Sequence, residues 1–277
     1  MTALSQMPKT SFHTGLLADM PVTEAVRMIR DHGYDMAEIN GETLPWGEAH
    51  LGIETPASVI SQLAGMGPYS ALCIHHRDFG SKDADRRDAA QLWTHAMMAR
   101  AVDLGIDVVH VIPGEQTELS ALYGALARGV EVAQAKGLTF ALEPIVGREI
   151  GTAASALAAI EAAPGLKINF DASHLKPMGD DVTEAARKLA PHAVHMHLKD
   201  VTGTPADFRF VPIGQGEIDL PAMMRALFES GYDGPVSIEH ESHWFAGDTR
   251  SGAQVLKDGL SDIRRLCEAA LGRQPVA

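Results

Sequence analysis

The chain has 277 residues, of which 45% are hydrophobic and 21% are charged, a composition that is ordinary for a globular protein and allows one large domain. Its net charge of −13 argues against a nucleic-acid-binding surface, which needs a basic stripe. The two cysteines, Cys73 and Cys267, cannot build a disulfide framework, and the sequence predicts neither a signal peptide nor a membrane span. We therefore expect a cytoplasmic protein that binds no nucleic acid and no membrane.

Short apolar runs alternate with segments of helical periodicity along the whole chain. The apolar runs predict eight strands, at residues 11–17, 35–40, 71–76, 108–114, 139–144, 167–171, 193–200 and 236–242. The periodic segments predict helices at residues 22–33, 56–65, 83–104, 119–136, 152–163, 182–189, 220–230 and 252–271. No linker interrupts the alternation, so residues 1–277 are expected to form one domain, with flexible ends at about 1–10 and 272–277.

Strands that alternate with helices form a parallel sheet, and eight such units close into a barrel. The predicted fold class is therefore α/β, as a single (β/α)8 TIM barrel. The alternative is a doubly wound open sheet, which would carry a glycine-rich nucleotide-binding turn after its first strand. Residues 12–20, FHTGLLADM, do not form such a turn. In a barrel the active site lies at the C-terminal ends of the strands, where polar residues are informative.

Four of the expected strands end in residues that can bind a metal ion. His195 and His197 lie two apart in the run AVHMHLKD, so both point to one face, with His197 nearer the strand end. Three other runs end in carboxylates, at Glu143, Asp171 and Glu239. This pattern predicts a site for one divalent metal ion, with His195 one layer deeper and supporting it. The simpler interpretations are a buried core histidine, a carboxylate that caps a neighbouring helix and, for the aspartate, a helix N-cap.

Histidines near the strand ends are candidates for substrate contacts. His174 follows Asp171 by three residues, in D-A-S-H, which brings two polar groups together in one turn. One of the adjacent His75 and His76 must face the mouth of the barrel. Hydrogen bonds to backbone groups would explain these histidines equally well.

Two further candidates lie in loops. Trp46, in the loop after the second strand, can form an apolar pocket wall, although single exposed aromatic residues are common. The loop at 201–217 is long for a barrel connection, and long loops tend to be functional. It carries Arg209, which can hold a substrate oxygen or can be only a surface charge.

Five short motifs occur in order at the spacing of a barrel: LEP at 142–144, FDASH at 170–174, HMHLKD at 195–200, GQGEIDL at 214–220 and SIEHE at 237–241. With these motifs the chain resembles the xylose-isomerase-like barrel superfamily, in particular its sugar phosphate isomerase/epimerase group, which includes inosose isomerase and ketose 3-epimerases. The resemblance implies a TIM barrel that binds one divalent metal ion and acts on a small sugar or polyol ketone. Barrels of this kind often pair, which would make the protein a homo-oligomer.

The resemblance also assigns roles to individual residues. It implies four metal ligands, namely Glu143, Asp171, His197 and Glu239. It implies substrate contacts for His174, for Glu149 (six residues after the first ligand) and for Arg209, which matches an arginine of inosose-isomerase-like members. Two departures stand out. Gly203 occupies the position at which the epimerases carry their substrate arginine. Arg209 occupies the position of a zinc-binding histidine of endonuclease IV, and because an arginine cannot bind zinc, this second departure argues against a role in DNA repair.

The chemistry that such a site suits is removal of a proton next to a carbonyl group. A divalent ion (Mn²⁺, Mg²⁺, Co²⁺ or Zn²⁺) would stabilise the resulting enediolate as a Lewis acid, while Glu143 and Glu239 act as base and acid on its two faces. We therefore expect a metal-dependent isomerase or epimerase of a ketose, keto-acid sugar or inosose in carbohydrate metabolism. A dehydratase or other lyase, with His75, His76 or His195 as its acid, is the first alternative. A non-catalytic sugar-binding barrel and an AP endonuclease are the others.

Overall fold

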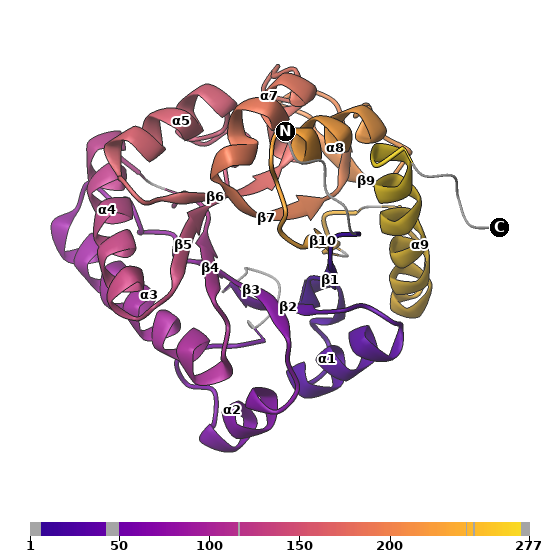
Figure 1. The fold of residues 1–277 in the computed structure, drawn as a ribbon. Helices are drawn as coiled ribbons and strands as arrows, with labels where there is room; N and C mark the ends of the chain where they lie inside the picture. Colours follow the sequence, from indigo (N-terminus) through magenta and orange to yellow (C-terminus); the bar gives the residue numbers. More distant parts are fainter. Residues whose placement is uncertain (1–6, 43–49, 116, 242, 246, 273–277) are drawn as a thin grey trace.

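Eight parallel strands form a barrel in the computed structural model, which describes residues 7–42, 50–115, 117–241, 243–245 and 247–272. The strands are β1 Thr10–Phe12, β2 Ala37–Glu42, β3 Tyr69–His75, β4 Val108–Val111, β5 Thr139–Leu142, β6 Lys167–Asp171, β7 Ala193–Leu198 and β10 Val236–Ile238. They follow one another around the barrel in the order β1, β10, β7, β6, β5, β4, β3 and β2 (Figure 1). A parallel bridge between His13 and Glu38 joins the two ends of this sheet. The (β/α)8 barrel is confirmed.

Helices lie outside the ring of strands and cover it (Figure 1). They are α1 Val22–Asp31, α2 Ala57–Ala64, α3 Ala84–Leu104, α4 Leu119–Ala135, α5 Ala153–Ala162, α7 Val182–Leu189, α8 Leu220–Glu229 and α9 Gly252–Ala270, with shorter turns at η1 Thr14–Leu17, α6 Ala172–Leu175 and η2 Ala190–His192. Capping residues in the sequence mark where helices begin and end. In α3, for example, the Asp83 side chain accepts a hydrogen bond from Arg86 N, and Gly105 ends the helix at a φ of 66°. Within the described residues, no helix has the length and apolar content that crossing a membrane requires.

The strands are apolar because helices or the barrel interior cover both of their faces. All residues of β1, β2, β3 and β10 are buried, as is usual for a parallel sheet inside a barrel. Buried polar residues on or directly after the strands therefore stand out. The candidate site described below is built from such residues.

The first strand is shorter than the apolar run at 11–17 predicts. The chain leaves the sheet at His13, whose side chain accepts a hydrogen bond from Gly15 N and caps the 3-10 turn η1. Thr10, placed in the expected flexible end, is buried in β1, and its backbone N–H donates to Asp35. Hydrophobicity alone cannot separate a strand from a following 3-10 turn, because both can be buried.

The long loop expected at 201–217 contains an antiparallel hairpin, formed by β8 Asp200–Thr202 and β9 Arg209–Val211. The buried carboxylate of Asp200 holds the loop together, because it accepts hydrogen bonds from the backbone N–H groups of Val201, Gly214, Gly216 and Ile218. A Cβ atom at Gly216 would lie 2.0 Å from Asp200 Oδ1, so only glycine fits there. This contact explains the second glycine of the GQGEIDL motif.

Replacing Asp200 with asparagine is therefore expected to destabilise the protein. The amide has one acceptor oxygen and no charge, so at least two of the four backbone donors lose their partner, at a cost of at least about 2 kcal/mol in free energy of unfolding. Urea unfolding of the metal-free protein measures this difference. Asp233→Asn, on the exposed turn before β10, is the matched control, and equal losses in the two variants would contradict the role given to Asp200.

Candidate active site

Four potential metal ligands lie at the C-terminal ends of four neighbouring strands. Glu143 directly follows β5, Asp171 ends β6, His197 is the last residue but one of β7, and Glu239 directly follows β10. Because these strands are adjacent in the barrel, their ends lie side by side. One ligand atom from each residue lies within 4.8 Å of those of the other three, and all four side chains are buried. The structure thus brings together the four residues that the sequence predicts as ligands.

The imidazole of His197 lies in the middle of this cluster. Its Nδ1 is 3.3 Å from Glu143 Oε1 and 3.3 Å from Glu239 Oε2. In Asp171, Oδ1 accepts a hydrogen bond from Ser173 N, whereas the buried Oδ2 forms an ion pair with Lys199. Three buried carboxylates in close contact repel one another unless a cation lies among them. The donor set, three carboxylates and one imidazole, fits a divalent metal ion.

A buried lysine, Lys199, also reaches this cluster. Its Nζ lies 3.0 Å from Asp171 Oδ2, forms an ion pair with Glu239, and lies 4.3 Å from the centre of the Phe210 ring. Burial alone would raise the pKa of the Glu239 carboxyl, but the positive charges of His197 and Lys199 hold it well below its ordinary value. The pKa of Asp171 is likewise lowered against the effect of burial, mainly by Lys199.

Lys199 could have been found in the sequence. The alternation that points His195 and His197 into the barrel continues past β7 and points Lys199 the same way. The same rule applies to Asn169, two residues before Asp171, whose Nδ2 donates to Glu143 Oε2 at 2.9 Å.

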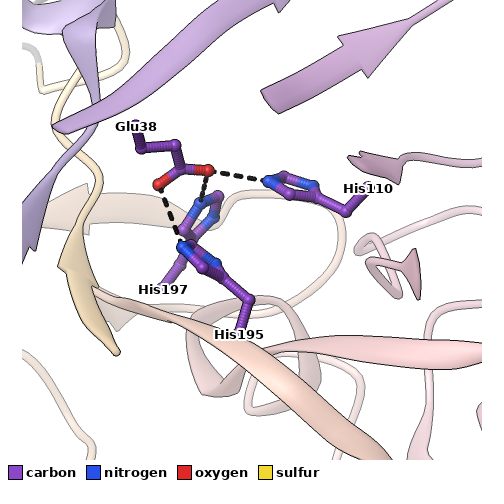
Figure 2. A group of neighbouring side chains, drawn as sticks. All are labelled: Glu38, His110, His195 and His197. Atoms are coloured by element: carbon purple, nitrogen blue, oxygen red, sulfur yellow. Dashed lines mark hydrogen bonds and ion pairs between the residues drawn. The ribbon is translucent and has the colours of Figure 1, made fainter. Parts of the chain in front are cut away.

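A second polar layer lies beneath the four ligands, inside the barrel. His195 does not reach the ligand cluster: its Nδ1 lies 3.0 Å from Asn169 Oδ1 and its Nε2 lies 3.2 Å from Ser70 Oγ. Burial lowers the pKa of His195 to about 3, so this ring is uncharged near neutral pH. Its position, one layer below the site, is the one expected. Glu38, which the sequence did not single out as a site residue, lies at the centre of this layer (Figure 2).

A cavity of about 1020 Å³ opens above the cluster, and both Glu143 and Glu239 line it. Its aromatic wall is formed by Trp93, Phe208, Phe210 and Trp244. Basic and acidic side chains line the rest, among them Lys199, Arg77, Arg148, Glu42 and Glu241. The cavity is large enough for a sugar, and two of the three carboxylates of the cluster, those of Glu143 and Glu239, face whatever it holds.

Two of the expected substrate residues line this cavity. His174 lies with Nε2 3.5 Å from Glu143 Oε1, and its Nδ1 accepts a hydrogen bond from Val146 N, so Nε2 carries the proton when the ring is neutral. Burial lowers the pKa of His174, which favours the neutral ring. His75 also lines the cavity, and burial together with the charge of Arg148 lowers its pKa to about 4.

Two other expected substrate residues, Arg209 and Glu149, are not among the residues that line the cavity. Arg209 is exposed on β9, because its neighbours Phe208 and Phe210 point into the cavity and alternation turns Arg209 away. Glu149 is also exposed and does not line the cavity, whereas the preceding residue, Arg148, does. Trp46 lies outside the described residues.

Comparison with known proteins identifies the family. Residues 26–265 match the sequence profile of the family described as "Xylose isomerase-like TIM barrel". The chain belongs to this family. Among curated proteins it is similar to the L-ribulose-5-phosphate 3-epimerase UlaE of Salmonella paratyphi A, with 26% identity over 268 residues, 91% of this chain and 92% of that one.

Two solved structures share the fold. The structure of an L-ribulose 3-epimerase superposes with a TM-score of 0.78 at 22% identity and covers 95% of this chain and 96% of its own. The structure of the IOLI protein with a bound zinc atom superposes with a TM-score of 0.74 at 20% identity and covers 92% of this chain and 97% of its own. The predicted resemblance is thereby confirmed, and the lyase alternative gains no support from these relatives.

One buried carboxylate of this xylose isomerase-like barrel is expected to make stability depend on pH. Burial, reinforced by the charge of Glu239, raises the pKa of Glu42 to about 8 from 4.5. Between these values the folded state holds a proton that the unfolded state has lost, so the free energy of unfolding falls as pH rises, by up to about 1.4 kcal/mol per pH unit. Glu42→Gln is expected to remove this contribution between pH 5 and 8.

Urea unfolding of the metal-free protein across this pH range measures the effect. Glu149→Gln, at an exposed position, is the control and is expected to keep the wild-type slope. If Glu42→Gln kept that slope as well, the assignment of a raised pKa to Glu42 would be wrong.

Proposed function

We propose that this protein is a divalent-metal-dependent epimerase or isomerase that acts on a ketose, keto-acid sugar or inosose. The observation that carries the proposal is the convergence of Glu143, Asp171, His197 and Glu239 at one side of a sugar-sized cavity. The names of similar proteins support it, since both UlaE and the superposed L-ribulose 3-epimerase are 3-epimerases of ketoses. An epimerase of a ketose is therefore the first candidate within this class.

Glu143, Asp171, His197 and Glu239 would hold the metal ion, through three carboxylates and one imidazole nitrogen. Oxygen-rich sites of this kind suit Mn²⁺, Mg²⁺ or Co²⁺, and the zinc atom of the similar IOLI structure keeps Zn²⁺ among the candidates. When bound, the ion supplies a Lewis acid that stabilises negative charge on substrate oxygens.

The residues of the chain supply the proton transfers. Epimerisation next to a carbonyl group needs a base on one face of the carbon atom and an acid on the other. Glu143 and Glu239 come from different strands, and both line the cavity, so one can remove a proton while the other returns one to the opposite face. The neutral imidazole of His174 carries its proton on Nε2, beside Glu143, and can donate a hydrogen bond to a substrate oxygen.

Substrate binding uses the rest of the cavity. Phe208 and Phe210 offer an apolar face to the carbon side of a sugar, and His75 offers a polar edge. Arg77 and Arg148 are the basic groups of the lining, but Glu115 already contacts both, through its carboxylate 3.3 Å from Arg77 Nη2 and its backbone oxygen 3.4 Å from Arg148 Nη1. Phosphorylated and free sugars are therefore both candidates.

A substrate panel tests the proposal. Metal-free protein with added Mn²⁺ is incubated with L-ribulose 5-phosphate, L-ribulose, other ketoses, keto-acid sugars and inososes, and the products are identified by ¹³C NMR. We expect one epimer or isomer pair to interconvert, and conversion to stop when EDTA removes the metal. Loss of water from a substrate would show a lyase instead, and no conversion with metal bound would contradict the proposed class.

The proposed setting is the cytoplasm, in carbohydrate metabolism, without nucleic-acid or membrane partners. Cys73 and Cys267 are both free and buried, which is compatible with a reducing compartment. Homo-oligomer formation stays a prediction from the family resemblance and can be measured by analytical ultracentrifugation.

A further inference from the structure

The polar layer beneath the ligand cluster is centred on one carboxylate. Glu38 comes from β2, His110 from β4 and both His195 and His197 from β7, and all four side chains lie inside the barrel with at most 1% of their surface exposed. Figure 2 shows the three imidazole rings gathered around the carboxylate of Glu38. A buried glutamate in this position needs several hydrogen-bond donors to be stable.

Both oxygens of the Glu38 carboxylate face hydrogen-bond donors. Its Oε1 lies 2.7 Å from His110 Nε2 and 2.9 Å from His197 Nε2, and its Oε2 accepts a hydrogen bond of 2.6 Å from Ser237 Oγ. An ionised carboxylate can only accept hydrogen bonds, so the histidine nitrogens that face it carry hydrogen. His197 therefore holds its proton on Nε2, on the side away from the cavity.

This arrangement leaves the other nitrogen of His197 directed at the site. Nδ1 lies 3.3 Å from both Glu143 Oε1 and Glu239 Oε2, the carboxylate oxygens of the ligand cluster. In the metal-free protein Nδ1 also faces carboxylates and therefore carries hydrogen, which a bound cation would displace. Donation from Nε2 to Glu38 keeps the ring in this orientation and makes the freed Nδ1 a stronger ligand. Both effects favour binding of a cation at Nδ1.

The same four residues could in principle hold a second metal ion, because their ligand atoms also lie within 4.8 Å of one another. The short contacts argue against this. Ligand atoms around a tetrahedral ion at 2.0–2.1 Å lie roughly 3.3 Å apart. The 2.7 Å and 2.9 Å contacts to Glu38 Oε1 are instead hydrogen-bond lengths, and both nitrogens of His195 already have partners in Asn169 and Ser70.

We infer that Glu38 is a positioning residue that fixes His197 with Nδ1 toward the metal ion and thereby tightens metal binding. This inference rests on the proposed function, since it takes His197 as a metal ligand. Glu38 itself lies below the ligand cluster and is not among the residues that line the cavity. Carboxylate partners of metal-binding histidines typically change metal affinity by 10- to 100-fold.

The test compares metal affinity in three proteins, measured by calorimetry with Mn²⁺ added to metal-free wild type, Glu38→Gln and Ser237→Ala. Ser237→Ala removes one donor to Glu38 and leaves the bond to His197 in place, so it is the matched control. We expect Glu38→Gln to bind Mn²⁺ about 10- to 100-fold more weakly, Ser237→Ala to stay within about threefold of wild type, and the stoichiometry to remain one.

Three results would overturn the inference. Equal affinities of wild type and Glu38→Gln would show that Glu38 does not act through His197, while leaving the proposed function intact. Two ions in wild type and one in Glu38→Gln would identify a second metal site instead. A wild type that binds no metal would reject the proposed function and this inference together.

A measurement on the wild type covers the case in which Glu38→Gln does not fold. In Zn²⁺-loaded protein with ¹⁵N-labelled histidine, we expect His197 to show a proton on Nε2 that is protected from exchange, and a metal-bound Nδ1. A proton on Nδ1, with metal on Nε2, would overturn the inference without any variant.

Discussion

Glu143→Gln and Glu239→Gln are each expected to lower the rate of epimerisation by about 10²- to 10⁴-fold, the contribution of a positioned acid or base. Glutamine keeps the shape of glutamate and can still offer an oxygen, but it cannot take up a proton. Both carboxylates line the cavity beside His197, so no other residue of the cluster is placed to replace them in the same role. Initial rates in both directions, at saturating metal and with metal content checked, measure the loss.

The two variants should differ in which epimer exchanges its proton with solvent. If each glutamate serves one face, each variant keeps slow exchange only from the epimer whose proton faces the remaining glutamate. Glu149→Gln, at an exposed position away from the cavity, is the control and should retain the wild-type rate. Wild-type turnover in either cluster variant would remove that glutamate from the mechanism.

Lys199→Met is expected to destabilise the metal-free protein by about 3–5 kcal/mol, because it leaves the buried charges of Asp171 and Glu239 without their nearest cation. The loss should shrink when metal is bound, since the ion then supplies the positive charge. By linkage, a change that destabilises the metal-free form more than the metal-bound form tightens metal binding. With the proposed function, Lys199 would thus compete with the metal for the same carboxylates.

Urea unfolding with and without saturating Mn²⁺ measures both parts of this prediction, and calorimetry measures the affinity directly. Lys257→Met, at an exposed position of α9, controls for the loss of one positive charge from the whole protein. Weaker metal binding by Lys199→Met would contradict competition and would mean that the ammonium group supports the bound ion instead.

The barrel and its ligand cluster could be predicted because both follow from short-range patterns. Alternating apolar runs and helical segments determine the order of strands, and the rule that strand tips meet at one end of a barrel brings Glu143, Asp171, His197 and Glu239 together. His195 also lies one layer below the ligands, as its position two residues earlier in the strand predicts. These inferences need only the chain's local periodicity.

The residues that sequence reasoning missed depend on contacts across the barrel. Glu38 of β2 becomes central only because its partners come from other strands of the barrel, and no local pattern reveals that His110, His197 and Ser237 all donate to it. The role of the long loop also depends on its folded shape. The hairpin β8–β9 directs Phe208 and Phe210 into the cavity and leaves Arg209 exposed. The sequence alone predicts a loop without strands here, so it does not indicate which of these side chains face the cavity.

Deuterium uptake from solvent reports on the proposed proton transfer more directly than any variant does. Metal-loaded wild-type protein would convert its substrate in D₂O, with the products followed by NMR and mass spectrometry from the first few per cent of conversion. Proton removal by one glutamate and return by the other predicts one deuterium at the inverted carbon, next to the carbonyl group, and none lost as water. Conversion without deuterium at that carbon would contradict proton exchange with solvent as the mechanism of this barrel.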